Sequence, residues 1–266
     1  MFSEKVRFLK EYYRFRKNCK PRGGHGIHSP FVFELYTKTI DAETKESIFE
    51  DIERVRRNLK SSKVQVQDTT FGAGSQKPKA KELGQIVRNV CVPSYFGRLL
   101  YRLARDLKPE TIIELGTSLG ISTLYIANAN RNSKVYSIEG DDYLAKLAVE
   151  NLNNLGIQNV NVVNGDFDFE LPRIISSLEK IDFAFIDGNH TKEATLRYFS
   201  LLAEKIHSGS AIIFDDIRWN ENMYNAWCEI CANEKVSISI DLFNCGIVFF
   251  RKGISKQHFY LRYGPF

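Results

Sequence analysis

The chain has 266 residues, of which 43% are hydrophobic and 26% are charged, and its formal net charge is +5. This composition excludes global disorder and is typical of one large domain, or of one core domain with an extension. No apolar run reaches the roughly 18 residues that a membrane-spanning helix requires, and the first residues lack the apolar segment of a signal peptide. Five cysteines without such a signal indicate reduced thiols and a cytoplasmic protein.

The N-terminal 92 residues are expected to form a helical extension. Residues 1–18 alternate charged and apolar side chains, which predicts a basic helix that ends at Pro21–Gly24. The positive charges could contact an anionic partner, but such runs usually form the solvated face of a helix, so nucleic-acid binding is not expected. His25 and His28 follow, and two histidines without a nearby carboxylate favour a hydrogen-bonded turn over a metal site.

The rest of the extension contains helices and one loop rich in glycine. Helices are predicted over residues 31–40, 42–59, 80–90 and 95–107, and a short strand over residues 64–67. The loop Gly72–Ser75 is either a lid over a ligand or a plain connector. The extension would cover the site and select the substrate, and its candidates for substrate contact are His25, His28 and this loop.

Residues 111–120 contain the motif around which the chain is organised. Thr111–Leu115 is a short apolar run that predicts a strand, Gly116 and Gly120 lie in the loop, and residues 121–129 follow as a helix. Glycines let a ligand approach the backbone closely, and the helix N-terminus offers free N–H groups. The spacing E-x-G-x-x-x-G differs from the G-x-G-x-x-G of dinucleotide-binding proteins. The carboxylate of Glu114 in this site suits a cationic ligand group better than a phosphate.

The remainder of the chain alternates strands and helices. Strands are predicted over residues 134–139, 160–163, 181–186 and 211–214, and helices over residues 143–155, 172–178, 192–206 and 220–233. This alternation predicts an α/β fold with a doubly wound, mostly parallel sheet and helices on both faces. Residues 236–243 and 247–251 predict an antiparallel hairpin. The aromatic and basic tail, residues 253–266, would pack on the sheet or on a second subunit, which leaves a homo-oligomer open.

This pattern resembles the class I S-adenosylmethionine (SAM) methyltransferases over about residues 95–252, and the domain is expected to span residues 93–252. The resemblance implies a Rossmann-like, seven-stranded sheet that the hairpin closes. It also implies that Glu114 lies near the methionine amino group, that Glu139 binds the ribose hydroxyls and that Asp166 binds the adenine. The cofactor-binding residues implied in this way are Glu114, Gly116, Thr117, Ser118, Gly120, Glu139, Gly140, Gly165, Asp166, Phe167 and Asp187. For Glu139 or Asp166 alone, capping of the next helix is an equal alternative.

Three aspartates follow the last two parallel strands. Asp187 follows one strand, and Asp215 and Asp216 follow the next. Because ligands bind at the carboxyl ends of the strands in such sheets, these carboxylates are expected to meet there. They would repel one another unless protonated or bridged by a cation, and their oxygens suit Mg²⁺. The alternative is that they cap helices and bond to loop ends.

The aspartates resemble those of the metal-dependent O-methyltransferases, which include catechol, caffeoyl-CoA and macrolide-sugar enzymes. The resemblance implies that Asp187, Asp215 and Asp216 hold the metal. It further implies that His190, three residues after Asp187, is the catalytic base, as in the sugar enzymes. Catechol enzymes have a lysine at that offset and an asparagine in place of Asp216, which puts a catechol substrate in doubt.

The sequence therefore predicts a SAM-dependent methyltransferase that carries out Mg²⁺-dependent O-methylation of a hydroxyl on a small molecule. Two other functions stay open, namely a metal-independent methyltransferase acting on nucleic acid or protein, and a non-catalytic SAM-binding module. No Asn-Pro-Pro-Tyr type motif follows the fourth strand, which argues against N-methylation of a base. Cys228 and Cys231 form a C-x-x-C pair, which is expected to be incidental helix packing because nothing completes a zinc set.

Overall fold

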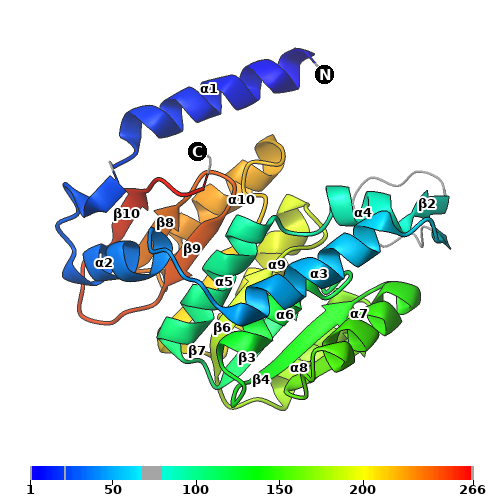
Figure 1. The fold of residues 1–266 in the computed structure, drawn as a ribbon. Helices are drawn as coiled ribbons and strands as arrows, with labels where there is room; N and C mark the ends of the chain where they lie inside the picture. The colour runs from blue at the N-terminus through cyan, green and yellow to red at the C-terminus, as the bar shows by residue number, and fades with distance from the viewer. Residues whose placement is uncertain (1, 21, 68–79, 265–266) are drawn as a thin grey trace. The chain divides into compact units, whose positions relative to one another are not determined.

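The computed structural model describes residues 2–20, 22–67 and 80–264 (Figure 1). The chain forms two compact units. One is continuous and consists of Glu43–Ile181, and the other has two parts, Met1–Ala42 and Asp182–Phe266. Among the helices within the described ranges, none has the length and the hydropathy that a bilayer-crossing segment needs.

The continuous unit begins with helices and goes on with alternating strands and helices. Its elements are α3 (Ser47–Ser61), β1 (Gln65–Gln67), β2 (Ala80–Glu82), α4 (Leu83–Asn89), α5 (Ser94–Leu107), β3 (Thr111–Leu115), α6 (Ile121–Ala129), β4 (Lys134–Glu139), α7 (Asp142–Asn154), β5 (Val160–Asn164) and α8 (Phe167–Ser176). Helix α6 is apolar on all sides, and its residues from Ile121 to Ala127 are buried because α5 and α3 pack against it (Figure 1). This packing fixes the helix that starts at the glycine loop.

The two-part unit joins the N-terminal helices to the C-terminal strands. Its elements are α1 (Phe2–Asn18), the 3-10 turn η1 (Arg22–Gly24), α2 (Pro30–Leu35), the π-helix η2 (Tyr36–Ile40), β6 (Ile181–Ile186), α9 (Lys192–Leu202), β7 (Ile206–Phe214), α10 (Glu221–Ala232), β8 (Ile238–Asp241), β9 (Gly246–Phe249) and β10 (Gln257–Tyr260). All residues of β8 and β9 are buried. Thr191 and Asn220 accept backbone N–H bonds as the N-caps of α9 and α10, so these helices begin just after the loops that follow β6 and β7.

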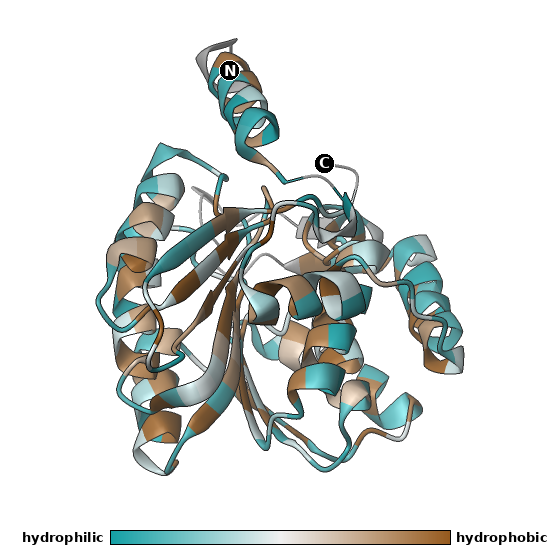
Figure 2. Cartoon of the chain, turned by 90° about the vertical axis from the view of Figure 1, so that its left-hand side faces the viewer, coloured by the Kyte–Doolittle hydropathy of each residue, from teal (hydrophilic) through white to brown (hydrophobic). Residues whose placement is uncertain are grey.

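The main sheet has eight strands in the order β10-β8-β9-β7-β6-β3-β4-β5. β3, β4 and β5 pair in parallel, whereas β9 is antiparallel to both β7 and β8. Figure 2 shows that the strands carry much of the hydrophobic colour and that helices lie on both sides of them. The predicted mostly parallel sheet with its closing hairpin is confirmed. The eighth strand was not predicted, and it arises because residues 257–260 of the tail pair in parallel with β8.

Several predicted boundaries were wrong, each for a local reason. The helix predicted over residues 42–59 begins only at Ser47. Ala80–Glu82, which was predicted to start a helix, pairs with β1 as a strand before α4 begins. Helix α8 begins at Phe167, five residues before Pro172, because Asp166 caps it by accepting the N–H of Asp168. Strand β7 begins at Ile206 rather than at Ala211, since the polar stretch 207–210 is extended too.

Replacement of Gly97 by Ala is expected to destabilise the continuous unit. A Cβ at Gly97 would overlap the ring of Tyr125, which is buried and held by the hydrogen bond of its hydroxyl to Oε1 of Glu53 at 2.9 Å. Alanine improves helix propensity, but overpacking costs about 1–3 kcal/mol, so the free energy of unfolding should fall. Urea unfolding measures this, with the exposed Asn89→Ala in α4 as the control. An unchanged free energy of unfolding would contradict this prediction, because it would mean that the ring of Tyr125 can move away from α5 at no cost.

Candidate functional site

Main-chain hydrogen bonds hold the loop between β3 and α6. The N–H groups of Gly116 and Thr117 donate to the carbonyl of Ile138 at 3.0 and 3.2 Å. Gly116 and Gly120 have φ angles of 102° and 78°, which residues with a side chain rarely adopt. Ser118 has a φ of 48°, and its buried Oγ has no hydrogen-bond partner among the described residues. The loop therefore combines strained backbone with an unsatisfied polar atom, a combination found at ligand sites.

Glu114 is fully buried at the end of β3. Its Oε2 accepts hydrogen bonds from the hydroxyls of Thr123 and Ser137 at 2.6 and 2.5 Å. Its Oε1 is buried and has no hydrogen-bond partner within the described ranges. Burial raises the pKa of Glu114, and the hydroxyl bonds oppose that rise. A buried carboxylate oxygen without a donor costs free energy, so this atom is suited to receive a cationic donor such as the ammonium group of SAM.

Glu139 connects the glycine loop to the start of α7. Its Oε2 accepts the N–H of Ser118 at 2.6 Å, and its Oε1 accepts the N–H of Asp141 at 2.9 Å. Burial raises the pKa of Glu139, whereas these N–H groups and that of Gly140 lower it. Each carboxylate oxygen has two acceptor sites, so the carboxylate can also take ribose hydroxyls while it keeps the loop in place.

The third predicted cofactor segment, Gly165–Phe167, follows β5. The N–H of Gly165 donates to the carbonyl of Glu139 at 2.9 Å, which ties this segment to the second acid. Oδ1 of Asp166 accepts the N–H of Asp168 at 2.7 Å, so the acid does cap α8. Phe167 is the first residue of that helix and is half-buried. The chemistry of Glu114, Glu139 and the glycine loop fits SAM, and the capping of α8 uses Oδ1 of Asp166 rather than Oδ2.

In the two-part unit, the loops after β6 and β7 bring four predicted residues together. Nε2 of His190 lies 3.8 Å from Oδ1 of Asp187 and 4.0 Å from Oδ2 of Asp216. Asp215 donates its N–H to the carbonyl of Ile186 at 2.9 Å, and its Oδ1 accepts the N–H of Asp216 at 2.9 Å. We call Asp187, His190, Asp215 and Asp216 the acid–histidine cluster.

Burial and mutual repulsion set the charge state of this cluster. Burial raises the pKa of Asp215 well above its usual range, and the negative charges of Asp187 and Asp216 raise it further. Burial also raises the pKa of Asp216, which His190 partly offsets. Burial lowers the pKa of His190 against the attraction of Asp216. A histidine with a lowered pKa is neutral near pH 7, which is the form that accepts a proton.

The cluster has the donor chemistry of a divalent cation site. Carboxylate oxygens are the ligands that Mg²⁺ prefers, and a cation would relieve the repulsion among the aspartates. In the part of the chain that the structure describes, no three His, Cys, Asp or Glu side chains are arranged so that they could hold a metal ion. Binding of Mg²⁺ would therefore require the aspartates to turn toward a common point.

Trp219 is a neighbour of the cluster to which the sequence assigned no role. Its ring lies 5.9 Å from that of His190, at an interplanar angle of 33°, and 61% of the residue is exposed. An exposed indole against the histidine offers a flat apolar surface to an acceptor. Arg218, buried against Asp241, was missed as well, because its partner lies 23 residues away and no local pattern marks the pair.

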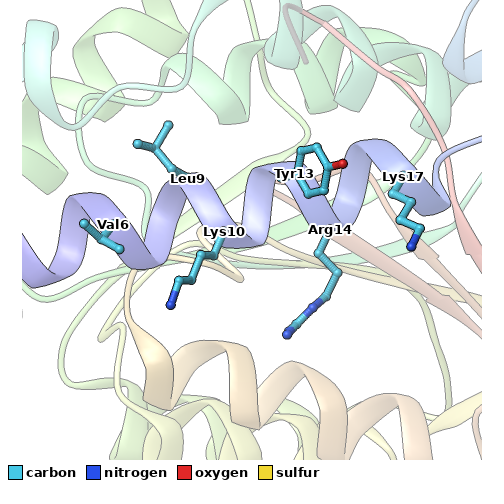
Figure 3. A pocket seen from close by; sticks show the side chains of 6 residues that line it. All are labelled: Val6, Leu9, Lys10, Tyr13, Arg14 and Lys17. Carbon is cyan, nitrogen blue, oxygen red and sulfur yellow. The ribbon is translucent and has the colours of Figure 1, made fainter.

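The N-terminal extension contains the predicted candidates for substrate contact. His25 and His28 are exposed. The loop Gly72–Ser75 lies outside the described residues. A pocket beside α1 is lined by Val6, Leu9, Lys10, Tyr13, Arg14 and Lys17, and it contains no predicted site residue (Figure 3). The cysteines of the C-x-x-C pair are both free thiols within α10.

Comparison with known proteins agrees with the fold. Residues 113–217 match a family model described as a methyltransferase domain. A catechol O-methyltransferase from Niastella koreensis is 28% identical over 124 residues, which cover 46% of this chain and 55% of that protein. A tRNA (guanine-N(7)-)-methyltransferase from Mycoplasma mobile is 31% identical over 112 residues, which cover 40% of this chain and 56% of that protein.

Solved structures share the architecture. An O-methyltransferase from Bacillus cereus in complex with SAH has a TM-score of 0.55 at 19% identity, and the match covers 77% of this chain and 92% of that chain. The chain spans little more than half of the length of the two curated relatives named above. The matched segment contains the glycine loop, Glu139 and the acid–histidine cluster. Residues 113–217 thus resemble a methyltransferase domain, and the fold is the one that the solved O-methyltransferase shares.

Proposed function

We propose that the protein is a SAM-dependent O-methyltransferase that methylates a hydroxyl of a small molecule and uses Mg²⁺. The observation that carries this proposal is His190, whose Nε2 lies within 4.0 Å of both Asp187 and Asp216. A neutral imidazole can take the proton of a hydroxyl acceptor, and the neighbouring carboxylates would stabilise the imidazolium that results. The names of the catechol and Bacillus cereus relatives support O-methylation.

Residues of this chain would bind SAM, orient the acceptor and remove its proton. When bound, SAM supplies an electrophilic methyl group, and Mg²⁺ lowers the pKa of a hydroxyl. Oε1 of Glu114 would receive the ammonium group of SAM, and Glu139 would hold its ribose hydroxyls. Asp187, Asp215 and Asp216 would hold the cation, and His190 would take the proton from the acceptor oxygen. The main task of the protein in methyl transfer is to align the nucleophile with the methyl group.

Calorimetry and turnover together test the proposal. SAM is titrated into the protein, Mg²⁺ is then titrated into the SAM complex, and hydroxylated sugars and phenols are screened with and without chelator. We expect SAM binding, Mg²⁺ binding, and turnover that the chelator abolishes. SAM binding without a response to Mg²⁺ would contradict the metal-dependent reaction, and no SAM binding would contradict the assignment of residues 111–120.

Replacement of His190 by Gln is expected to slow turnover without weakening SAM binding. Glutamine cannot accept the proton, and the loss of a general base typically lowers kcat by about 10²–10⁴-fold. His207→Gln is the matched control, because this histidine of the same unit pairs with Asp182 at 2.7 Å at the start of β7. Equal turnover of the two variants would show that His190 is not the base.

A second candidate, methylation of RNA, is favoured by the Mycoplasma mobile relative and by the basic face of α1. It predicts RNA binding that weakens steeply with salt. It also predicts turnover that chelator does not change, so the same screen with added tRNA separates the two functions.

A further inference from the structure

Three aromatic residues of helix α1 pack on one buried aromatic residue near the end of β8. The rings of Phe8, Tyr12 and Phe15 lie on one side of α1 and have their centroids 5.3, 5.4 and 5.3 Å from that of Phe243. Phe243 is fully buried and has a φ of 79°, which a residue with a large side chain rarely adopts. Such a conformation persists only where the surroundings enforce it, so α1 is part of what holds Phe243.

Arg218 is the link between this contact and the acid–histidine cluster. It follows Asp216 by two residues, and its side chain is only 3% exposed. Its Nη1 and Nη2 donate to the two oxygens of Asp241 at 2.8 and 2.7 Å, and Nη1 also donates to the carbonyl of Phe243 at 2.7 Å. Its guanidinium lies 5.0 Å from the ring centroid of Phe243. A buried, bidentate arginine of this kind fixes the backbone that carries it.

Two residues of α1, Arg7 and Glu11, contact Arg218 or its neighbour Trp219. Nη2 of Arg7 donates to the carbonyls of Arg218 and Trp219, at 3.4 Å each. Oε2 of Glu11 lies 4.0 Å from Nε of Arg218, and both atoms are buried without a hydrogen-bond partner among the described residues. The guanidinium of Arg218 therefore faces two carboxylates, Asp241 by direct bonds and Glu11 at longer range.

The segment that α1 holds contains a strained aspartate. Asp216 has a φ of 51°, and its carbonyl accepts the N–H of Trp219 at 2.8 Å. The N–H of the intervening Ile217 donates to the carbonyl of Asn244 at 3.0 Å, on the turn that leads into β9. The direction of the Asp216 side chain thus depends on how firmly Arg218 and Trp219 are anchored.

We propose that α1 is a clamp on the segment Asp215–Trp219, and that Arg7, Glu11 and Arg218 are positioning residues for the acid–histidine cluster. The role in turnover rests on the proposed O-methyltransferase function, whereas the restraint of the segment by α1 does not. The N-terminal helix would then support catalysis through the backbone and side chain of this segment rather than by contact with the substrate.

Fluorescence of Trp219 reports the clamp without any need for turnover. The chain has two tryptophans, so Trp227→Phe makes Trp219 the only one. In this background we compare Arg7→Ala, Glu11→Ala and Arg7→Lys by time-resolved anisotropy. Lys10→Ala is the control, because it removes one charge from the pocket side of α1 (Figure 3). Circular dichroism confirms that each variant folds.

We expect Arg7→Ala and Glu11→Ala to increase the fast local motion of Trp219, and Arg7→Lys to restore part of the rigidity because it keeps a donor. In the same variants kcat should fall by roughly 10- to 100-fold, the scale of a misplaced catalytic group, with the Kd for SAM unchanged. Unchanged anisotropy in folded variants would overturn the clamp. Increased motion with unchanged kcat would overturn the positioning role, and a wild-type protein without turnover would overturn only the proposed function.

Discussion

Asp215→Asn is expected to abolish Mg²⁺-dependent turnover while it makes the ligand-free protein more stable. Asparagine keeps the shape of the side chain and the oxygen that accepts the N–H of Asp216 at 2.9 Å. It removes a buried carboxylate whose pKa is raised by burial and by the charges of Asp187 and Asp216. Stability and function should therefore change in opposite directions.

The size of both effects can be estimated. A cation bound as proposed would contribute several kcal/mol of charge stabilisation in the transition state, so its loss should lower kcat by about 100-fold or more. The midpoint of thermal unfolding should rise by roughly 2–4 °C for each kcal/mol of repulsion that is removed. Turnover assays measure kcat, thermal unfolding measures the midpoint, and calorimetry measures the affinity for Mg²⁺.

The exposed Glu221→Gln at the start of α10 is the matched control, because it removes one negative charge from the same unit outside the cluster. It should change neither turnover nor Mg²⁺ affinity. If Asp215→Asn lowered the unfolding midpoint and kept full activity, the aspartates would be structural hydrogen-bonding groups rather than cation ligands.

The strands and helices of the core could be predicted because short apolar runs are bounded by polar or glycine residues. Thr111–Leu115, Ile121–Ala129, Lys134–Glu139 and Ile181–Ile186 have the predicted ends. The eighth strand could not be predicted, since Gln257–Tyr260 becomes a strand only through its pairing with β8. The start of β7 was missed because His207–Ser210 is polar and contains a glycine, which locally indicates a loop.

The acid–histidine cluster could be predicted because its members follow two consecutive strands, and strand ends of this kind meet by topology. The contacts that hold the loop after β7 in place could not be predicted. Arg218 and Asp241 are distant in the sequence, and their bidentate bond depends on how β8 lies beside the loop after β7. Nothing near Phe243 in the sequence indicates that three aromatic residues of α1 pack on it.

Glu114→Gln is expected to weaken SAM binding by about 10- to 100-fold, because a hydrogen bond to a charged group contributes about 1.5–3 kcal/mol. Glutamine retains an oxygen for the hydroxyls of Thr123 and Ser137. Its amide nitrogen would occupy the place of Oε1 and would repel an ammonium group. The free energy of unfolding should change little, because the lost charge is offset by a buried amide without an acceptor.

A truncated ligand shows whether Glu114 acts on the ammonium group itself. Methylthioadenosine has the adenosine and sulfur of SAM but no amino-acid part, so its Kd should be the same for the wild type and Glu114→Gln. Glu139→Gln is the matched variant, because this carboxylate accepts the N–H groups of Ser118 and Asp141 and would hold the ribose, so both ligands should bind it more weakly. If Glu114→Gln weakened both ligands equally, the buried carboxylate would act by shaping the loop through Thr123 and Ser137, and the ammonium group would bind elsewhere.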